Sequence, residues 1–277
     1  MAPLLRSELF RLVRRWMPRI LLLILIGLVG LLYILLWVTV RSGAADEFAL
    51  RENLRLASVR DTGLNLVFQI GSVNIIIMTA SLIGSEYGWG TIRALLPRAR
   101  SRTAYFSAKL VTALLFVAVT VLIGLVVSFA ASAVITAVEG LPSGLGPQGL
   151  SRTVFATART TFVMLPYVAL TIMVTTLTRS VAAGIGLGLA VLFLESLFLS
   201  LIGLAGGIFE RLPGALISRN VQALLEANAA GLEDSFSSSG AAMPSVWQAA
   251  VVLAAYTVAF LFLAYRSFIK RDITAGS

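Results

Sequence analysis

Six apolar stretches dominate this chain and decide what it can fold into. A helix needs about 20 consecutive, mostly apolar residues to cross the hydrocarbon core of a bilayer. The stretches of suitable length are Ile20–Val40, Leu64–Ile83, Leu110–Val138, Thr160–Leu177, Val181–Gly206 and Val246–Tyr265. Charged residues make up only 13% of the chain, about half the fraction that is usual in soluble proteins. We therefore predict an all-α membrane protein, in which residues 1–277 form a single transmembrane domain with six spans.

The basic residues predict the orientation, because Lys and Arg collect on the cytoplasmic side of membrane proteins. With the N-terminus in the cytoplasm, fourteen bases and three acids lie inside, and eight bases and nine acids lie outside. The three inner acids are Glu8, Glu86 and Asp272. Both termini are then cytoplasmic, and residues 207–245 form a long extracytoplasmic connection. Because the bases are nearly all Arg, a pattern associated with GC-rich bacterial genomes, we expect a multi-pass protein of the bacterial cytoplasmic membrane.

Residues 1–19 carry an amphipathic pattern. Their apolar side chains recur at helical spacing and form one stripe, which consists of Leu5, Leu9, Leu12, Val13 and Trp16. The opposite arc carries the charged residues Glu8, Arg11, Arg14 and Arg15. This pattern favours a helix that lies in the inner membrane interface with its apolar face toward the lipid. The alternative is an ordinary basic flank that happens to be helical.

The connection between the second and third stretches, residues 84–110, combines an acid, several glycines and a run of bases. We predict a short cytoplasmic helix over Glu86–Leu96, with Glu86, Gly90 and Arg93 on one face at the i, i+4, i+7 spacing. Pro97 would end this helix, and Ser101 can cap the next one. The alternative is a loop whose arginines only fix the topology. That alternative leaves the acid and the glycines unexplained.

The spacing Glu86-x3-Gly90-Thr91, followed by Leu95 and a run of bases, resembles the ABC-2 family of transporter permeases. The predicted layout is similar as well, with an amphipathic N-terminal helix, six spans, a long outer connection before the last span and a short cytoplasmic tail. The resemblance implies that the segment is a coupling helix, which docks into a groove on a separate ATP-binding cassette subunit. The coupling residues are then Glu86, Trp89, Gly90, Thr91, Arg93 and Leu95. It also implies export as the activity and a second permease copy, either in a homodimer or as a similar chain.

The residue types exclude several kinds of chemistry. The chain has no Cys and no His, which excludes Cys and His metal sites, Cys nucleophiles and Ser-His-Asp triads. Neither Lys109 nor Lys270 stands in the G-x4-G-K-[ST] pattern of a phosphate-binding loop. We therefore expect no enzymatic activity and no cofactor on this chain, with ATP and Mg²⁺ bound by the partner subunit. The net charge of +9 fits cytoplasmic flanks that meet anionic lipid better than nucleic-acid binding.

Other classes of membrane protein remain as alternatives. A secondary transporter or channel without an ATPase partner needs charges within the membrane, and only Glu195 offers one. A membrane-embedded enzyme is a poor fit without His, Cys or convergent acids. A non-transporting membrane subunit built on the same fold is the third alternative.

Two features of the fifth stretch stand out. A charge such as Glu195 at the middle of the bilayer costs about 2.5–3.5 kcal/mol on insertion scales. Either Glu195 is a polar point on a transport path or a dimer contact, or it is a protonated or hydrogen-bonded structural residue. Gly184 and Gly188 have the small-x3-small spacing that favours close helix packing, and we expect them to pack against the fourth span.

Overall fold

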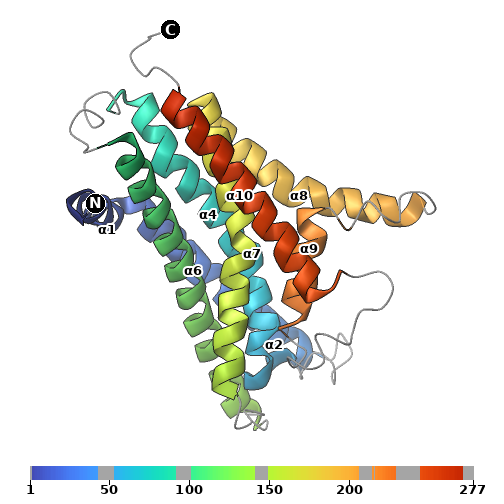
Figure 1. Ribbon diagram of the computed structural model, residues 1–277. Helices are drawn as coiled ribbons and strands as arrows, with labels where there is room; N and C mark the ends of the chain where they lie inside the picture. The colour runs from blue at the N-terminus through green and yellow to red at the C-terminus, as the bar shows by residue number, and fades with distance from the viewer. Residues whose placement is uncertain are drawn as a thin grey trace.

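The computed structural model of the chain describes residues 2–42, 53–91, 101–140, 149–205, 214, 216–228 and 244–270. In these ranges all regular elements are helical, which confirms the predicted all-α class (Figure 1). The elements are α1 (Ala2–Arg14), α2 (Trp16–Arg41), the 3-10 helix η1 (Leu56–Arg60), α4 (Thr62–Gly88), α6 (Arg102–Glu139), α7 (Gly149–Thr178), α8 (Val181–Ala205), α9 (Ile217–Glu226) and α10 (Val246–Lys270).

Five of these helices are long and apolar enough to cross a membrane: α2, α4 together with η1, α6, α7 and α10. Each contains one predicted stretch, because a backbone in hydrocarbon must satisfy its own polar groups and the helix does so within one segment. The helices also extend past the predicted ends. Helix α7 begins at Gly149 rather than at Thr160, and Thr153 and Thr157 donate to carbonyl oxygens four residues back, at 2.8 and 2.7 Å. These side-chain hydrogen bonds let a helix continue through polar residues.

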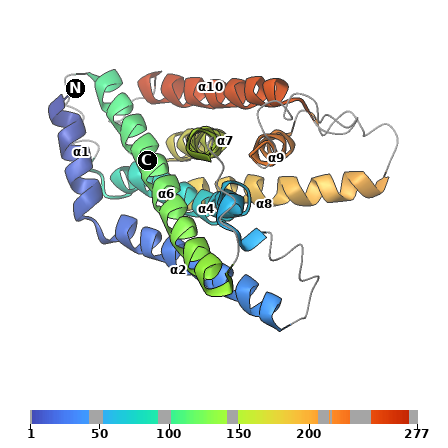
Figure 2. The same ribbon diagram turned by 90° about the horizontal axis from the view of Figure 1, so that it is seen from below.

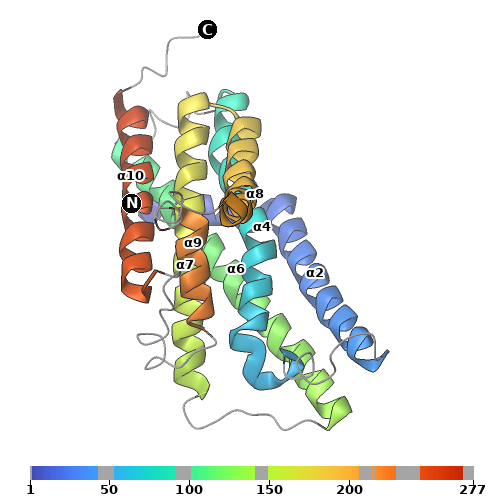
Figure 3. The same ribbon diagram turned by 90° about the vertical axis from the view of Figure 1, so that its right-hand side faces the viewer.

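The fifth predicted stretch corresponds to α8, whose course differs from that of the other long helices. Its first part runs beside α4 and α7, and its second part turns away across the direction of the bundle (Figures 1 and 3). Helix α9 then lies beside α7 and α10. Its buried side chains Ile217, Val221 and Leu224 share an apolar core with Val163 of α7 and Leu253 of α10. The prediction treated 207–245 as a connection outside the membrane, whereas α9 packs along the part of α7 that was predicted to lie within it.

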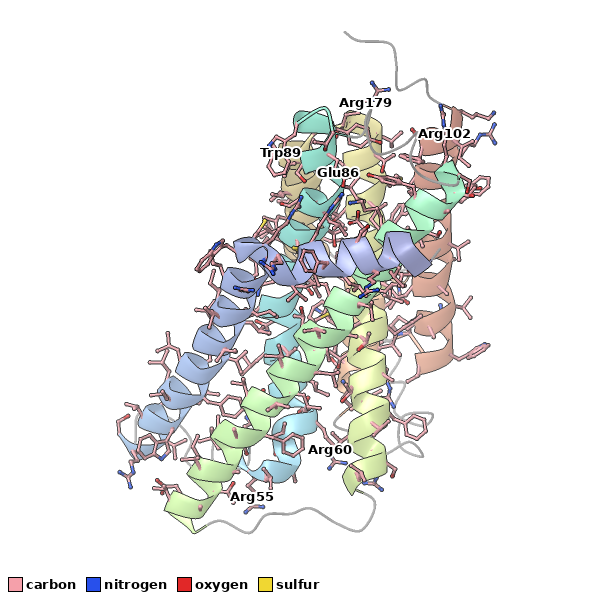
Figure 4. The ribbon with its side chains drawn as sticks, turned by 90° about the vertical axis from the view of Figure 1, so that its left-hand side faces the viewer. Arg55, Arg60, Glu86, Trp89, Arg102 and Arg179 are labelled. Carbon is pink, nitrogen blue, oxygen red and sulfur yellow. The ribbon has the colours of Figure 1, made fainter. Side chains whose placement is uncertain are left out.

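Helix α1 crosses the bundle at a large angle to α4 and α6 (Figures 2 and 4). It lies nearer to the end of the molecule that holds Glu86, Trp89, Arg102 and Arg179 than to the end that holds Arg55 and Arg60 (Figure 4). Ser101 caps α6 at the first of these ends, where its hydroxyl accepts from the N–H of Ala104 at 3.0 Å, and this confirms the predicted cap. The end of α4 and the start of α6 therefore lie toward the same end of the molecule as α1.

Two glycines of α8 lie where that helix comes closest to its neighbours. A Cβ atom at Gly184 would collide with the side chain of Thr175 in α7 and lie 3.1 Å from the Cβ of Ala80 in α4. A Cβ atom at Gly188 would lie 2.7 Å from a methyl carbon of Ile76 in α4 and 2.9 Å from the hydroxyl of Thr171 in α7. Both glycines of α8 thus lie in close contact with two neighbouring helices, α7 and α4.

We expect Gly184→Val and Gly188→Val each to lower the free energy of unfolding by about 1–3 kcal/mol, because overpacking forces neighbouring atoms to move. Unfolding of the purified protein in detergent micelles measures this. The matched control is Gly186→Val, since a Cβ atom at Gly186 meets nothing within 4 Å. Equal losses for all three variants would show that helix propensity, not packing, explains the glycines.

Candidate functional site

Four charged side chains, from α1, α4 and α6, meet where α1 packs against the other two helices. The ammonium nitrogen of Lys109 in α6 lies 2.7 Å from a carboxylate oxygen of Glu86 in α4 and 2.8 Å from one of Glu8 in α1. Arg11 of α1 lies 3.2 Å from Glu8 and 3.1 Å from Glu86. We call Glu8, Arg11, Glu86 and Lys109 the ion cluster. Its two acids and two bases balance in formal charge.

The centre of the ion cluster is removed from solvent. Glu86 is 2% exposed, and Glu8 and Lys109 are each 5% exposed, while the side chain of Arg11 is partly exposed. Besides the two carboxylates, Lys109 donates to the carbonyl oxygen of Leu82 at 3.2 Å. The three N–H groups of the ammonium thus have three acceptors. These buried ion pairs join side chains of α1, α4 and α6, and removing one partner of such a pair is strongly destabilising.

The predicted helix over Glu86–Leu96 is wrong in its first half. Glu86 belongs to the last turn of α4, which ends at Gly88, and Gly90 has a φ of +66°, in the left-handed region. Glycine ends helices in this way because it adopts that region without strain. Glu86 and Gly90 therefore do not share a helical face, and the side chain of Glu86 is buried in the bundle. Residues 93 and 95, also predicted for coupling, lie outside the described residues.

Trp89 and Thr91 are the parts of the predicted coupling segment that face outward. Trp89 is 69% exposed, and the guanidinium carbon of Arg15 lies 5.5 Å from the centre of its ring. Thr91 is also exposed, with its hydroxyl 3.5 Å from the carbonyl oxygen of Glu86. An exposed aromatic side chain, with Arg15 against its ring, thus lies at the same end of the molecule as Glu86, where α4 ends (Figure 4).

Glu195 has a defined structural partner. One oxygen of its carboxylate accepts the backbone N–H of Ile217 at 2.8 Å, and the other accepts that of Ser218 at 2.9 Å. These N–H groups belong to the first turn of α9, and the first N–H groups of a helix have no acceptors within that helix. A carboxylate also interacts favourably with the positive end of a helix dipole. Glu195 therefore attaches the start of α9 to the middle of α8.

Sequence reasoning missed most of the ion cluster. It placed Glu8 and Arg11 on the outward arc of α1, and it treated Lys109 only as an inner flanking base. One signal was available, because two of the three acids predicted on the inner side, Glu8 and Glu86, are members of the cluster. Among the described residues, no group of three or more acids could hold a metal ion.

The family described as "Protein of unknown function (DUF2705)" matches residues 20–274. The chain belongs to the DUF2705 family. The match begins after α1 and includes Glu86, Lys109 and Glu195, but not Glu8 or Arg11. No curated protein matches this DUF2705 member.

Proposed function

We propose that this DUF2705 member is the membrane-spanning permease subunit of an ABC-2 type transporter, acting as an exporter. A separate ATP-binding subunit would hold ATP and Mg²⁺, and a second permease copy would complete the pathway. The observation that supports this most is the ion cluster, which joins α1 to the last turn of α4 and to the first turns of α6.

The ion cluster gives a partner a way to move the membrane helices. A subunit bound at Trp89 and Thr91 pushes on the end of α4, and the buried ion pairs transmit that motion to α6 and α1. Separating buried charges is costly, so we expect α1, the last turn of α4 and the first turns of α6 to move together rather than one by one. In the alternating-access mechanism that we propose, this common motion tilts α4 and α6 and shifts the pathway between inward and outward states.

We also propose that α8 and α9 together make the fifth of six membrane crossings, with both chain termini in the cytoplasm. Helix α8 enters beside α4 and α7, and α9 begins beside Glu195 and runs on along α7 (Figure 3). A helix that begins within a membrane needs acceptors for its first N–H groups. The carboxylate of Glu195 supplies them for two residues, Ile217 and Ser218.

The test is recovery of the partner from native membranes. We expect the tagged chain to retain an ATPase with a phosphate-binding loop, identified by mass spectrometry. The Trp89→Ala, Thr91→Ala double variant should recover about tenfold less of it, since exposed aromatic side chains dominate many interfaces. Glu86 is unsuitable for this test because its replacement would disturb the fold.

Trp247→Ala is the matched control, because Trp247 is 73% exposed and lies near the start of α10, far from the α4 end. Equal loss of the ATPase in both variants would contradict docking at Trp89. If the wild-type chain recovers no such ATPase in several detergents, a secondary transporter or channel becomes the better proposal.

A further inference from the structure

A cavity of about 590 Å³ opens between α4, α7, α8 and α9, and the mechanism above does not use it. This volume lies in the range of pockets that bind drug-sized ligands, roughly 300–1,000 Å³. Asn65 and Gln69 of the lining lie in the first turns of α4, at the opposite end of that helix from Glu86. The cavity is therefore separate from the ion cluster.

The lining combines polar groups with aromatic rings. Gln69 of α4 and Gln222 and Glu226 of α9 are exposed, although Gln69 lies within a helix that can cross a membrane. Polar groups on such a helix are costly when they face hydrocarbon, so this surface is suited to water or to a polar ligand. The apolar wall includes Phe68 and Tyr167, whose ring centres are 6.2 Å apart.

Among the described residues that line the cavity, the formal charge has one sign: Glu226 is the one carboxylic acid, and there is no Lys or Arg. Arg219, the basic residue of α9, is not among the lining residues and has an interaction of its own. Glu195 lies directly behind the wall, because it accepts the N–H of Ser218, which lines the cavity. A second carboxylate therefore lies next to the lining, at the opposite end of α9 from Glu226.

We propose that this cavity binds an amphipathic organic cation. Aromatic ring faces attract cations, and the attraction increases when the site is shielded from water. The carboxylate of Glu226 supplies the counter-charge, the amides of Gln69 and Gln222 hold polar substituents, and Phe68, Tyr167 and Phe193 contact the apolar part. That the bound cation is the exported cargo rests on the proposed export function. That the cavity binds such a cation does not.

The experiment uses the full chain in nanodiscs of zwitterionic lipid, without any ATPase. The probes are tetraphenylphosphonium and tetraphenylborate, which have similar shape and size and opposite charge. We expect saturable binding of tetraphenylphosphonium above that of empty nanodiscs, and none of tetraphenylborate. Glu226→Gln should weaken the binding about tenfold, and Phe193→Leu should weaken it severalfold, because they remove the counter-charge and one ring.

Glu139→Gln is the matched control, since it makes the same chemical change at an acid that pairs with Arg41 outside the cavity. Saturable binding of both ions with equal affinity, or of neither, would overturn the proposal, as would unchanged binding by both Glu226→Gln and Phe193→Leu. Because no ATPase is present, absence of binding leaves the permease proposal intact. Conversely, an absent ATPase in the pull-down leaves the cation site intact.

Discussion

Lys109→Met is expected to lower the free energy of unfolding by about 3–5 kcal/mol, the range for breaking a buried ion pair from one side. The methionine fills a similar volume but leaves the carboxylates of Glu8 and Glu86 buried, with only the partly exposed Arg11 as counter-charge. The loss is measured by unfolding the purified chain in mild detergent, with circular dichroism as the signal.

A double variant separates the lost charge from the lost side chain. Glu86→Gln combined with Lys109→Met removes one acid and one base and leaves the pair of Arg11 and Glu8, whose atoms lie 3.2 Å apart. The double variant should therefore be more stable than Lys109→Met alone, by at least about 1 kcal/mol, since neighbouring sites in one network are not additive. The control is Lys270→Met, which makes the same change at the only other lysine of the chain, exposed at the end of α10. A double variant that loses the sum of the two single losses would show that the cluster does not act as a unit.

The long helices could be predicted from the sequence because one physical requirement determines them. Apolar residues in a run of about 20 must lie in hydrocarbon, and the backbone there must be helical. Five of the six stretches accordingly lie within α2, α4, α6, α7 and α10, and α8 contains the fifth stretch up to Ala205, where the described residues end. The ends were less predictable, because threonines such as Thr153 satisfy their hydroxyls on their own helix and so do not end it.

The candidate site depended on contacts that no local pattern contains. Glu8 has the angular position of a polar-face residue, and only the docking of α1 onto α4 and α6 shows that this face is turned inward. Glu86 was predicted to begin a new helix, but α4 runs on through it and ends at Gly88 instead. Helical spacing gives the angle of a side chain around its own axis and says nothing about which neighbour occupies that direction.

Glu195 shows the same limit, because its partners lie 22 and 23 residues further along the chain. The sequence identified a charge in an apolar helix, and two interpretations followed, a point on a transport path or a structural residue. The structure adds a hydrogen-bonded partner and so makes the structural interpretation testable. A role in transport stays a prediction.

Glu195→Ala is expected to lower the free energy of unfolding by about 2–4 kcal/mol, because two N–H groups at the start of α9 lose their acceptors. Glu195→Gln should lose less, since its amide retains one acceptor oxygen for one of the two N–H groups. Hydrogen–deuterium exchange by mass spectrometry follows α9 directly, and Ile217 and Ser218 should exchange faster in both variants than in the wild-type chain.

Glu226→Ala removes an acid from the other end of α9 and serves as the control. Glu226 is exposed and lies at the C-terminal end of the helix, where a negative charge interacts unfavourably with the dipole. Its loss should leave the exchange of α9 unchanged or slightly slower. If Glu195→Ala behaves in the same way, the apolar contacts of Val221 and Leu224 with α7 and α10 hold α9 without the carboxylate. The charge of Glu195 would then require another explanation, and the transport-path interpretation would become the stronger one.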